Sequence, residues 1–335
     1  MMNRSPRPSS EDVAQLARVS RATVSAYLNR TRYVSPELGE RIQQAIDQLN
    51  YTPDPLARAL KKKDVQTIGL ILPVMSRFYT PMMEAINEYA RTLHYDLLIA
   101  SSDEEAEREM ELINIFIAKR ISGILIAPCS NSNSALLNDI ARHGIPLVQV
   151  NRRAEGVEAS SVVSDNFKAA YSATEHLVKR GKRRIVLLGY DPTTLTNQDK
   201  KRGYDAARAE LGVEADLTVI IKEHDVAAIT EAFRGFLATG TKFDSVIATT
   251  QGKTTIAIKL LKQNNFRIPQ DVGVIGFDDT PWSELLSPAL TVVSENTYAM
   301  GKEAVQLLME RMMKDERVEP RHIVLEDEFI LREST

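Results

Sequence analysis

The sequence predicts an α/β protein in which a small head of three helices precedes a larger body of two doubly wound lobes. Two patterns indicate this fold. Short amphipathic helices separated by brief turns fill residues 9–49, and apolar strands alternating with amphipathic helices fill the chain from residue 65. Charge divides the chain at the same place. Residues 1–63 hold eleven basic and six acidic side chains, whereas the whole chain has a net charge of −3. A basic head on an acidic body suggests that only the head meets a polyanion.

Length and composition set the class of protein. The chain has 335 residues, of which 43% are hydrophobic and 26% charged, which suits a globular protein of two or three domains. Cys129 is the single cysteine, so an internal disulfide is excluded. The N-terminal MMNRSPRPSSED has no apolar stretch that could serve as a signal peptide, and no run approaches the roughly 18 apolar residues of a membrane span. We therefore expect a cytoplasmic protein.

Capping residues and apolar spacing define the three helices of the head. Ser9 or Ser10 can cap the first helix, Ser20 the second and Ser35 the third, which begins with Pro36. The predicted core positions are Val13, Leu16 and Ala17 in the first helix, Val24, Tyr27 and Leu28 in the second, and Leu38, Ile42, Ala45, Ile46 and Leu49 in the third. A turn of about three residues between the first two helices is typical of a helix-turn-helix.

The remaining face of the second helix carries short polar and small side chains, which would let the helix approach base edges in a major groove. Arginine can bond guanine through two hydrogen bonds, alanine or a threonine methyl can meet a thymine methyl, and hydroxyls can hold phosphate. The candidate DNA-binding residues here are Ser20, Arg21, Ala22, Thr23, Ser25, Ala26 and Asn29. The alternative is a three-helix packing module whose second helix is merely solvated.

The body contains eight strand-like apolar runs separated mostly by helical patterns. They lie at Ile68–Leu72, Leu97–Ala100, Gly123–Ala127, Leu147–Val150, Ile185–Leu188, Val219–Ile221, Val246–Thr249 and Val274–Phe277. Continuous apolar strands between helices predict parallel sheets that are covered on both faces. Two such sets predict two doubly wound lobes.

The body contains no convincing catalytic motif. The run Gly252-Lys253-Thr254-Thr255 is similar to the end of a phosphate-binding P-loop, but Ile247 stands where that motif requires glycine. We therefore expect a loop that enters a helix at Ile256–Leu261. The five histidines lack metal-ligand spacing, and Asp278 beside Asp279 is not by itself an acid–base pair. The sequence thus predicts no enzyme activity, no metal and no cofactor.

Taken together, the head and the following segment resemble the lac repressor family of bacterial transcription regulators. The residues that carry the resemblance, in order, are Asp12-Val13-Ala14, Val19-Ser20, Thr23-Val24-Ser25, Leu28-Asn29, Val34-Ser35, Leu49-Asn50-Tyr51 with Pro53, and Leu56-Ala57-Arg58 with Leu60. The likeness extends over nearly the whole chain. It implies a helix-turn-helix domain at 1–52, a hinge helix and linker at 53–64, and an effector domain of the periplasmic-binding-protein type I at 65–335. The first lobe would comprise about 65–162 and 291–320, and the second about 163–290 and 321–335.

The resemblance also implies how DNA would be bound. The segment Pro55–Lys61 matches a hinge helix that enters the minor groove, where Leu60 would be the apolar wedge between base pairs. Arg58 and Lys61 join the DNA-binding candidates. Arg18 stands where the family often has glycine. The last expected strand, near 329–331, ends close to Thr335 without a leucine-heptad tail, so we expect a homodimer on a near-palindromic operator.

Matching the family position by position yields candidate effector-binding residues. They are Arg77, Phe78, Tyr79, Ser130, Asn151, Arg152, Lys200, Thr249 and Asp278. Asn151 and Thr250 stand where the family often has aspartate, and Lys200 replaces a usual arginine. Because Arg77, Arg152 and Lys200 are cationic, we expect an anionic carbohydrate, such as a sugar acid or a sugar phosphate. In the alternative, both arginines face solvent or pair with acids such as Asp165.

These features predict a ligand-responsive, sequence-specific DNA-binding regulator, most often a repressor in this family, that controls carbohydrate genes. The first alternative is a solute-binding protein without DNA-binding activity, which the body alone would permit. The second is an α/β enzyme such as a nucleotide-dependent kinase, against which the incomplete P-loop argues.

Overall fold

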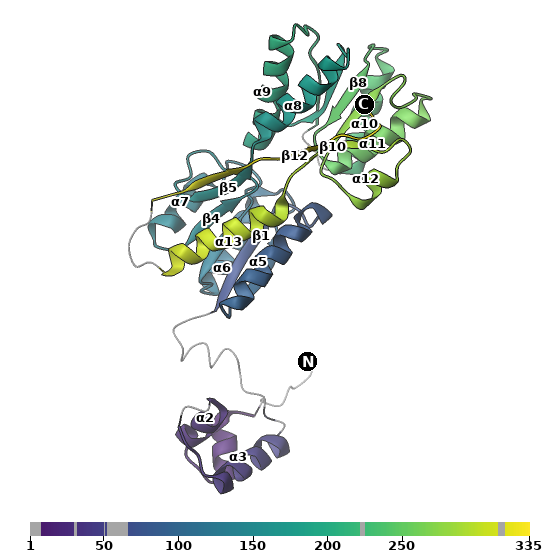
Figure 1. Ribbon diagram of the computed structural model, residues 1–335. Helices are drawn as coiled ribbons and strands as arrows, with labels where there is room; N and C mark the ends of the chain where they lie inside the picture. The colour runs from purple at the N-terminus through teal and green to yellow at the C-terminus, as the bar shows by residue number, and fades with distance from the viewer. Residues whose placement is uncertain (1–7, 30–31, 50, 52–65, 222–224, 314–318) are drawn as a thin grey trace, which may run out of the picture. The chain divides into compact units, whose positions relative to one another are not determined.

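The computed structural model describes residues 8–29, 32–49, 51, 66–221, 225–313 and 319–335 (Figure 1). The chain forms two compact units, one within Met1–Val65 and one within Gln66–Thr335. None of the helices in the described ranges is both long and apolar enough to cross a membrane.

The described part of the first unit contains α1 (Ser10–Ala17), α2 (Arg21–Asn29) and α3 (Pro36–Leu49). Ser9 caps α1 through a reciprocal pair of bonds: its hydroxyl accepts the Asp12 amide at 3.3 Å, and the Asp12 carboxylate accepts the Ser9 amide at 2.7 Å. Fully buried Val13, Val24 and Ile42 bring one residue from each helix into the core. The three predicted helices are confirmed in place and order.

One predicted core residue of the head is wrong. Leu16 is 42% exposed, whereas Ala14 is buried. Because Val13, Ala14 and Ala17 already form the inward stripe of α1, Leu16 lies at its edge. The small Ala14 side chain takes the buried position, where it allows the helices to approach closely. The sequence pattern instead favoured the larger side chain of Leu16.

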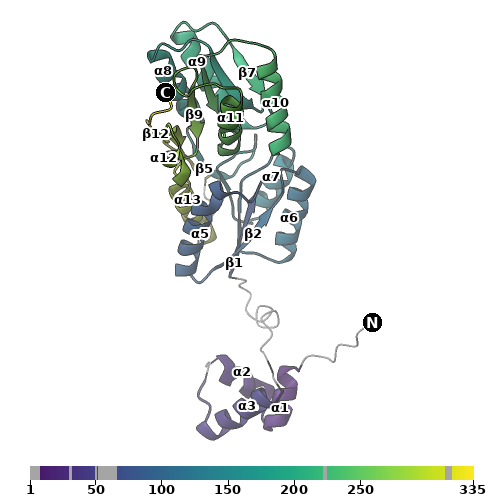
Figure 2. The same ribbon diagram turned by 90° about the vertical axis from the view of Figure 1, so that its right-hand side faces the viewer.

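The first lobe of the second unit is built on a parallel sheet in the order β11-β5-β4-β3-β1-β2. Its strands are β1 (Thr67–Leu72), β2 (Asp96–Ser101), β3 (Gly123–Ile126), β4 (Leu147–Val150), β5 (Ser160–Ser164) and β11 (His322–Leu325). Its helices are η1 (Arg77–Tyr79), α5 (Thr80–Thr92), α6 (Ala106–Ala118), α7 (Ser134–Arg142) and α13 (Thr297–Met313). One face of the sheet packs against α5 and α13, and the other packs against α6 and α7 (Figures 1 and 2).

The second lobe has a sheet in the order β12-β10-β9-β8-β6-β7, in which only the pairing of β12 with β10 is antiparallel among the described strands. Its strands are β6 (Ile185–Tyr190), β7 (Leu217–Ile220), β8 (Ser245–Ala248), β9 (Gly273–Phe277), β10 (Thr291–Ser294) and β12 (Glu328–Ile330). Its helices are α8 (Asn166–Lys179), α9 (Leu195–Glu210), α10 (Val226–Ala238), α11 (Gln251–Gln263) and α12 (Pro281–Leu285). Apolar side chains of α8 and α9 cover one face, and those of α10 and α11 cover the other.

The chain passes between the lobes after β5, after β10 and between β11 and β12 (Figure 1). The expected boundaries at 162, 290 and 321 each fall a few residues too early. They assign β10 (Thr291–Ser294) to the first lobe and β11 (His322–Leu325) to the second, whereas β10 pairs with β9 and β11 pairs with β5. Such short strands at sheet margins carry too few apolar residues for a sequence pattern to assign them to a sheet.

Candidate DNA-binding helix and effector cavity

The candidate recognition helix α2 begins as its sequence predicts. The Ser20 hydroxyl accepts the Thr23 amide at 3.1 Å and lies 2.9 Å from the Thr23 hydroxyl, so Ser20 caps the helix. Arg21 and Ala22 are exposed, and Thr23 and Ser25 are half-buried. The first turn of α2 therefore presents Arg21 and Ala22 to solvent, where a groove could receive them.

The other DNA-binding candidates are either buried or not fully within the described residues. Ala26 is only 4% exposed, and it lies beside Arg32, Tyr33 and Val34, which follow α2 in the chain. In this conformation Ala26 therefore does not face solvent as a base contact would require, and its expected role stays a prediction. Asn29 ends α2, and its side chain is not described. The hinge candidates Arg58, Leu60 and Lys61 lie outside the described residues.

In the second unit, a cavity of about 320 Å³ lies where the two lobes meet, which is within the usual range for a small-molecule site. Its walls come from segments that follow β1, β2 and β4 in the first lobe and β6, β8, β9 and β10 in the second. The carboxyl ends of parallel strands thus converge on it, as open α/β sheets predict. The expected effector-binding residues that line it are Phe78, Tyr79, Asn151, Arg152, Lys200, Thr249 and Asp278.

A hydrogen-bonded chain of buried polar groups crosses this cavity from lobe to lobe. The Tyr79 hydroxyl donates to Asn151 Oδ1 at 3.0 Å, and Asn151 Nδ2 donates to Glu295 Oε2 at 3.2 Å. Glu295 Oε1 lies 3.6 Å from Lys200 Nζ, which in turn donates to the Thr249 carbonyl at 3.2 Å. Glu295 follows β10, at a passage between the lobes, so a ligand that displaced one of these bonds would perturb the link between them.

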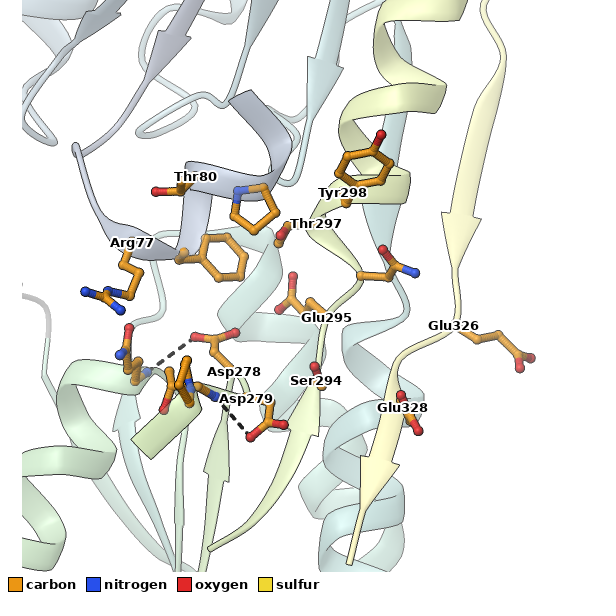
Figure 3. A pocket seen from close by; sticks show the side chains of 16 residues that line it. Arg77, Thr80, Asp278, Asp279, Ser294, Glu295, Thr297, Tyr298, Glu326 and Glu328 are labelled. Carbon is orange, nitrogen blue, oxygen red and sulfur yellow. Dashed lines mark hydrogen bonds between the residues drawn. The ribbon is translucent and has the colours of Figure 1, made fainter. Parts of the chain in front are cut away.

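The cations of the cavity are more neutralised than the sequence suggests. Arg152 donates to both carboxylate oxygens of Glu104, at 2.8 and 2.9 Å. Its partner is thus Glu104 rather than Asp165. Arg77 lies outside this cavity, on the wall of a neighbouring one of about 550 Å³, and is exposed. Figure 3 shows Arg77 on η1, with Asp278 and Glu295 on the other side of that neighbouring cavity.

Two carboxyl groups near Glu295 have unusual acidity. Burial, followed by the charge of Glu295, raises the pKa of Asp278 to about 7. The same two causes raise the pKa of Asp327, in the passage between β11 and β12, to about 7. The Gln251 amide donates to Asp278 at 3.3 Å and partly offsets this effect. Near neutral pH these two aspartates therefore do not both carry a full negative charge.

Sequence reasoning also named residues that lie elsewhere and missed some that line the cavity. Ser130 lines neither cavity, and Arg77 lines only the neighbouring one. Glu104, Glu295 and Lys253 were missed. Glu104 follows β2 and Glu295 follows β10, so their positions after strands could have indicated them; Lys253 was set aside with the incomplete P-loop.

A helix-turn-helix unit joined to a two-lobed body with a polar cavity between its lobes defines the class of a ligand-responsive DNA-binding regulator. Comparison with known proteins agrees. Residues 11–54 match the model for bacterial regulatory proteins of the lacI family, and residues 65–333 match the model for periplasmic binding proteins and the sugar-binding domain of the LacI family. The chain belongs to the LacI family of bacterial transcriptional regulators and is not an enzyme.

Relatives and solved structures span almost the whole chain. The transcriptional regulator RegA of Clostridium saccharobutylicum is 32% identical, with 97% of this chain and 98% of RegA covered. The ribose operon repressor of Haemophilus influenzae is 28% identical over 97% of both chains. A complex of the transcriptional regulator CelR with cellobiose is 27% identical, with a TM-score of 0.74 and coverage of 98% of this chain and 100% of CelR. The lac repressor bound to ONPG shares the fold, with a TM-score of 0.82 and 20% identity, over 98% of this chain and 100% of that one.

Proposed function

We propose that this protein is a homodimeric repressor of carbohydrate-metabolism genes in the cytoplasm, where its DNA target lies. Each head reads one half of a near-palindromic operator, with half-sites about one helical turn apart. A small carbohydrate in the cavity between the lobes sets the DNA affinity. The relatives named as repressors, and the matching sugar-binding domain, support this direction.

The observation that carries the proposal is the polar chain across the cavity. It contains a tyrosine hydroxyl, a side-chain amide, a carboxylate and an ammonium group, which can donate to and accept from sugar hydroxyls. Phe78 packs edge-on against Tyr79, with ring centres 4.9 Å apart, and adds an aromatic surface for the apolar face of a sugar ring. Because both lobes contribute, a ligand there has different contacts in an open and a closed body, which is the requirement for allosteric control.

Two of the three cations expected to bind an anionic effector do not serve that purpose in the structure. Arg152 is paired with Glu104, and Arg77 lies outside the cavity that holds the polar chain. Of the three expected cations, Lys200 is the one that lines this cavity and is not paired with Glu104. The proposed function therefore rests on recognition of sugar hydroxyls.

The test is selection of operator DNA from a random pool by the full chain, at low salt, where phosphate contacts are strongest. Selected DNA is then titrated with and without neutral sugars, uronates, keto-deoxy acids and sugar phosphates. We expect a palindromic consensus whose affinity changes with one compound, and the direction of that change identifies an inducer or a corepressor. Failure to enrich any sequence under any of these compounds contradicts the proposal and favours a solute-binding protein.

A further inference from the structure

Lys253 lies at the wall of the effector cavity, although its sequence motif predicted a loop that enters a helix. The structure places Gly252–Thr255 within the first turns of α11, which corrects the expectation of a loop there. The Lys253 side chain is 1% exposed and lines the cavity. Its Nζ donates to the Gly189 carbonyl at 2.8 Å. A lysine is almost never this deeply buried without a reason.

The backbone around Lys253 is shaped to hold it. Gly189, at the end of β6, has a positive φ of +96°, and a Cβ there would lie 2.2 Å from Lys253 Cδ. Gly189 therefore provides both a backbone conformation that favours glycine and the space that the Lys253 side chain occupies. This arrangement indicates a built site rather than a side chain that folded inward by chance.

The bonds that Lys253 makes do not by themselves explain its burial. An ammonium group has three donors, and the structure gives Lys253 Nζ one acceptor, the Gly189 carbonyl. That carbonyl already accepts the Thr249 hydroxyl at 3.0 Å, so it has a partner without the lysine. No carboxylate in the described part of the chain lies within ion-pair distance of Lys253. Burial and then the charge of Lys200 lower the pKa of Lys253 to about 8. Keeping the ammonium group charged in the folded protein therefore costs free energy.

A second buried lysine and a helix end face the same cavity. Lys200 is 5% exposed, and its Nζ lies 3.6 Å from Glu295 and 4.1 Å from the centre of the Phe277 ring. Gln251 and Gly252, the first residues of α11, also line the cavity. The amino end of a helix carries partial positive charge. Lys200 is paired with Glu295 as Arg152 is with Glu104, and the Gln251 amide at this helix end donates to Asp278 at 3.3 Å. Among the described residues that line the cavity, Lys253 is therefore the cation without an ion-pair partner.

We propose that Lys253 and Lys200, with the amino end of α11, form a subsite for an anionic group of the effector, either a carboxylate or a phosphate. This inference rests on the proposed function, because it assigns one part of the same cavity. The polar chain of Tyr79, Asn151 and Glu295 then faces the hydroxyl-bearing part of the same ligand. The effector class becomes a sugar acid or a sugar phosphate.

The experiment is calorimetric titration of the full-length protein with inorganic phosphate and with matched acid and neutral sugars. The pairs are glucuronate and galacturonate against glucose and galactose, glucose 6-phosphate against glucose, and a 2-keto-3-deoxy sugar acid against its neutral alcohol. We expect at least one acid to bind about tenfold or more tightly than its neutral counterpart. The pair that shows the difference distinguishes a carboxylate from a phosphate. Phosphate alone should bind weakly in the same place.

The variant pair is Lys253→Met and Lys259→Met. Lys259 lies on the exposed side of the same helix, so its replacement removes the same charge without entering the cavity. We expect Lys253→Met to weaken binding of the acid by about tenfold to a hundredfold, and Lys259→Met to leave it unchanged. Heat unfolding of each variant verifies that it folds.

Three results overturn the subsite. They are equal binding of an acid and its neutral counterpart, an equal effect of both substitutions, and no binding of phosphate or any acid to a wild-type protein that does select an operator. Failure of the wild-type protein to select an operator contradicts the proposed function instead. The two failures are thus distinguishable in one set of samples.

Discussion

At the scale of single residues, Lys253 is expected to reduce stability in return for binding. We predict that Lys253→Met raises the free energy of unfolding by about 2 kcal/mol at pH 7, because methionine fills the same space without a buried charge. Urea unfolding of the wild-type and variant proteins measures the difference. A residue that held β6 to α11 for structural reasons would give the opposite sign, a loss of stability.

The pH dependence of that difference has a definite sign. The unfolded chain holds the lysine proton with an ordinary pKa of 10.5, and the folded chain holds it with a pKa of about 8. Between these values the unfolded state binds more protons, so wild-type stability gains as pH rises through the window. The advantage of Lys253→Met is therefore full below pH 8 and shrinks towards pH 10.5. Asp191, Glu104 and Arg152 also act on Lys253, and they are unchanged in the comparison.

Arg18 is a residue in a conformation that favours glycine. It ends α1 with φ 51° and ψ 48°, and its amide donates to the Ala14 and Gln15 carbonyls. We predict that Arg18→Gly stabilises α1 by about 1 kcal/mol, because the left-handed conformation strains a residue with a Cβ. Hydrogen exchange of the α1 amides in the full chain measures this. Arg18→Ala keeps the strain, and an equal gain in that variant would attribute the effect to the lost charge instead.

Arg21 is the exposed cation at the start of α2. We predict that Arg21→Ala costs about 1–3 kcal/mol of binding to the selected operator and relaxes the preference at one base position. Binding to operators substituted at each position measures both effects. Arg21→Lys keeps the charge but not the planar fork. If it restores affinity for every sequence equally, Arg21 contacts phosphate rather than a base.

At the scale of elements, two passages between the lobes bring acids close to Asp278 of the second lobe. Glu295 follows β10, Asp327 separates β11 from β12, and Asp278 follows β9. The two aspartates have pKa values of about 7 when folded, against an ordinary 3.8, and Glu295 contributes to both shifts. The folded state then binds more protons than the unfolded state between these values. Stability from this cluster is present at low pH and is lost as pH rises towards 7.

We predict that Glu295→Gln flattens this dependence, because loss of its charge lowers the pKa of both aspartates. The measurement is the free energy of unfolding of the wild-type and variant proteins from pH 4 to pH 8. Glu328→Gln removes an exposed carboxylate from β12 and should leave the slope unchanged. Equal slopes for the wild-type protein and Glu295→Gln would mean that burial alone sets the acidity of this cluster.

The helices and strands also show which parts of the fold the sequence could predict and which it could not. The three head helices and the eight strong strands follow from capping residues and apolar runs, because each is a local pattern. The partners of β10 and β11 depend on which sheet edge each strand reaches after a passage between lobes. The pairing of Arg152 with Glu104 depends on the meeting of two loops that are 48 residues apart. Lys253 escaped because its motif, an incomplete P-loop, predicted only a loop that enters a helix, whereas its burial depends on the space that Gly189 leaves.

At the scale of the whole molecule, control of DNA binding requires that cavity and head be coupled through two states of the protein. Coupling between two binding sites is reciprocal: an effector that changes operator affinity by some factor must have its own affinity changed by the operator by the same factor. We predict this equality for the compound found by the operator test, with a factor of about 5–150. Calorimetric titration of the compound into free protein and into the protein–operator complex measures one factor, and operator titration with and without the compound measures the other.

The control for this comparison is DNA of scrambled sequence at the same length and salt, which binds through phosphate contacts alone. An effector that favours one arrangement of the two heads should change affinity for the operator more than affinity for scrambled DNA. The reason is that only the operator fixes the spacing of both half-sites. If the compound binds the cavity and both factors equal one, the body is a sugar-binding module that does not control the head. If the two factors differ from one and from each other, the compound also binds outside the cavity, and titration of Lys253→Met would show the remaining site directly.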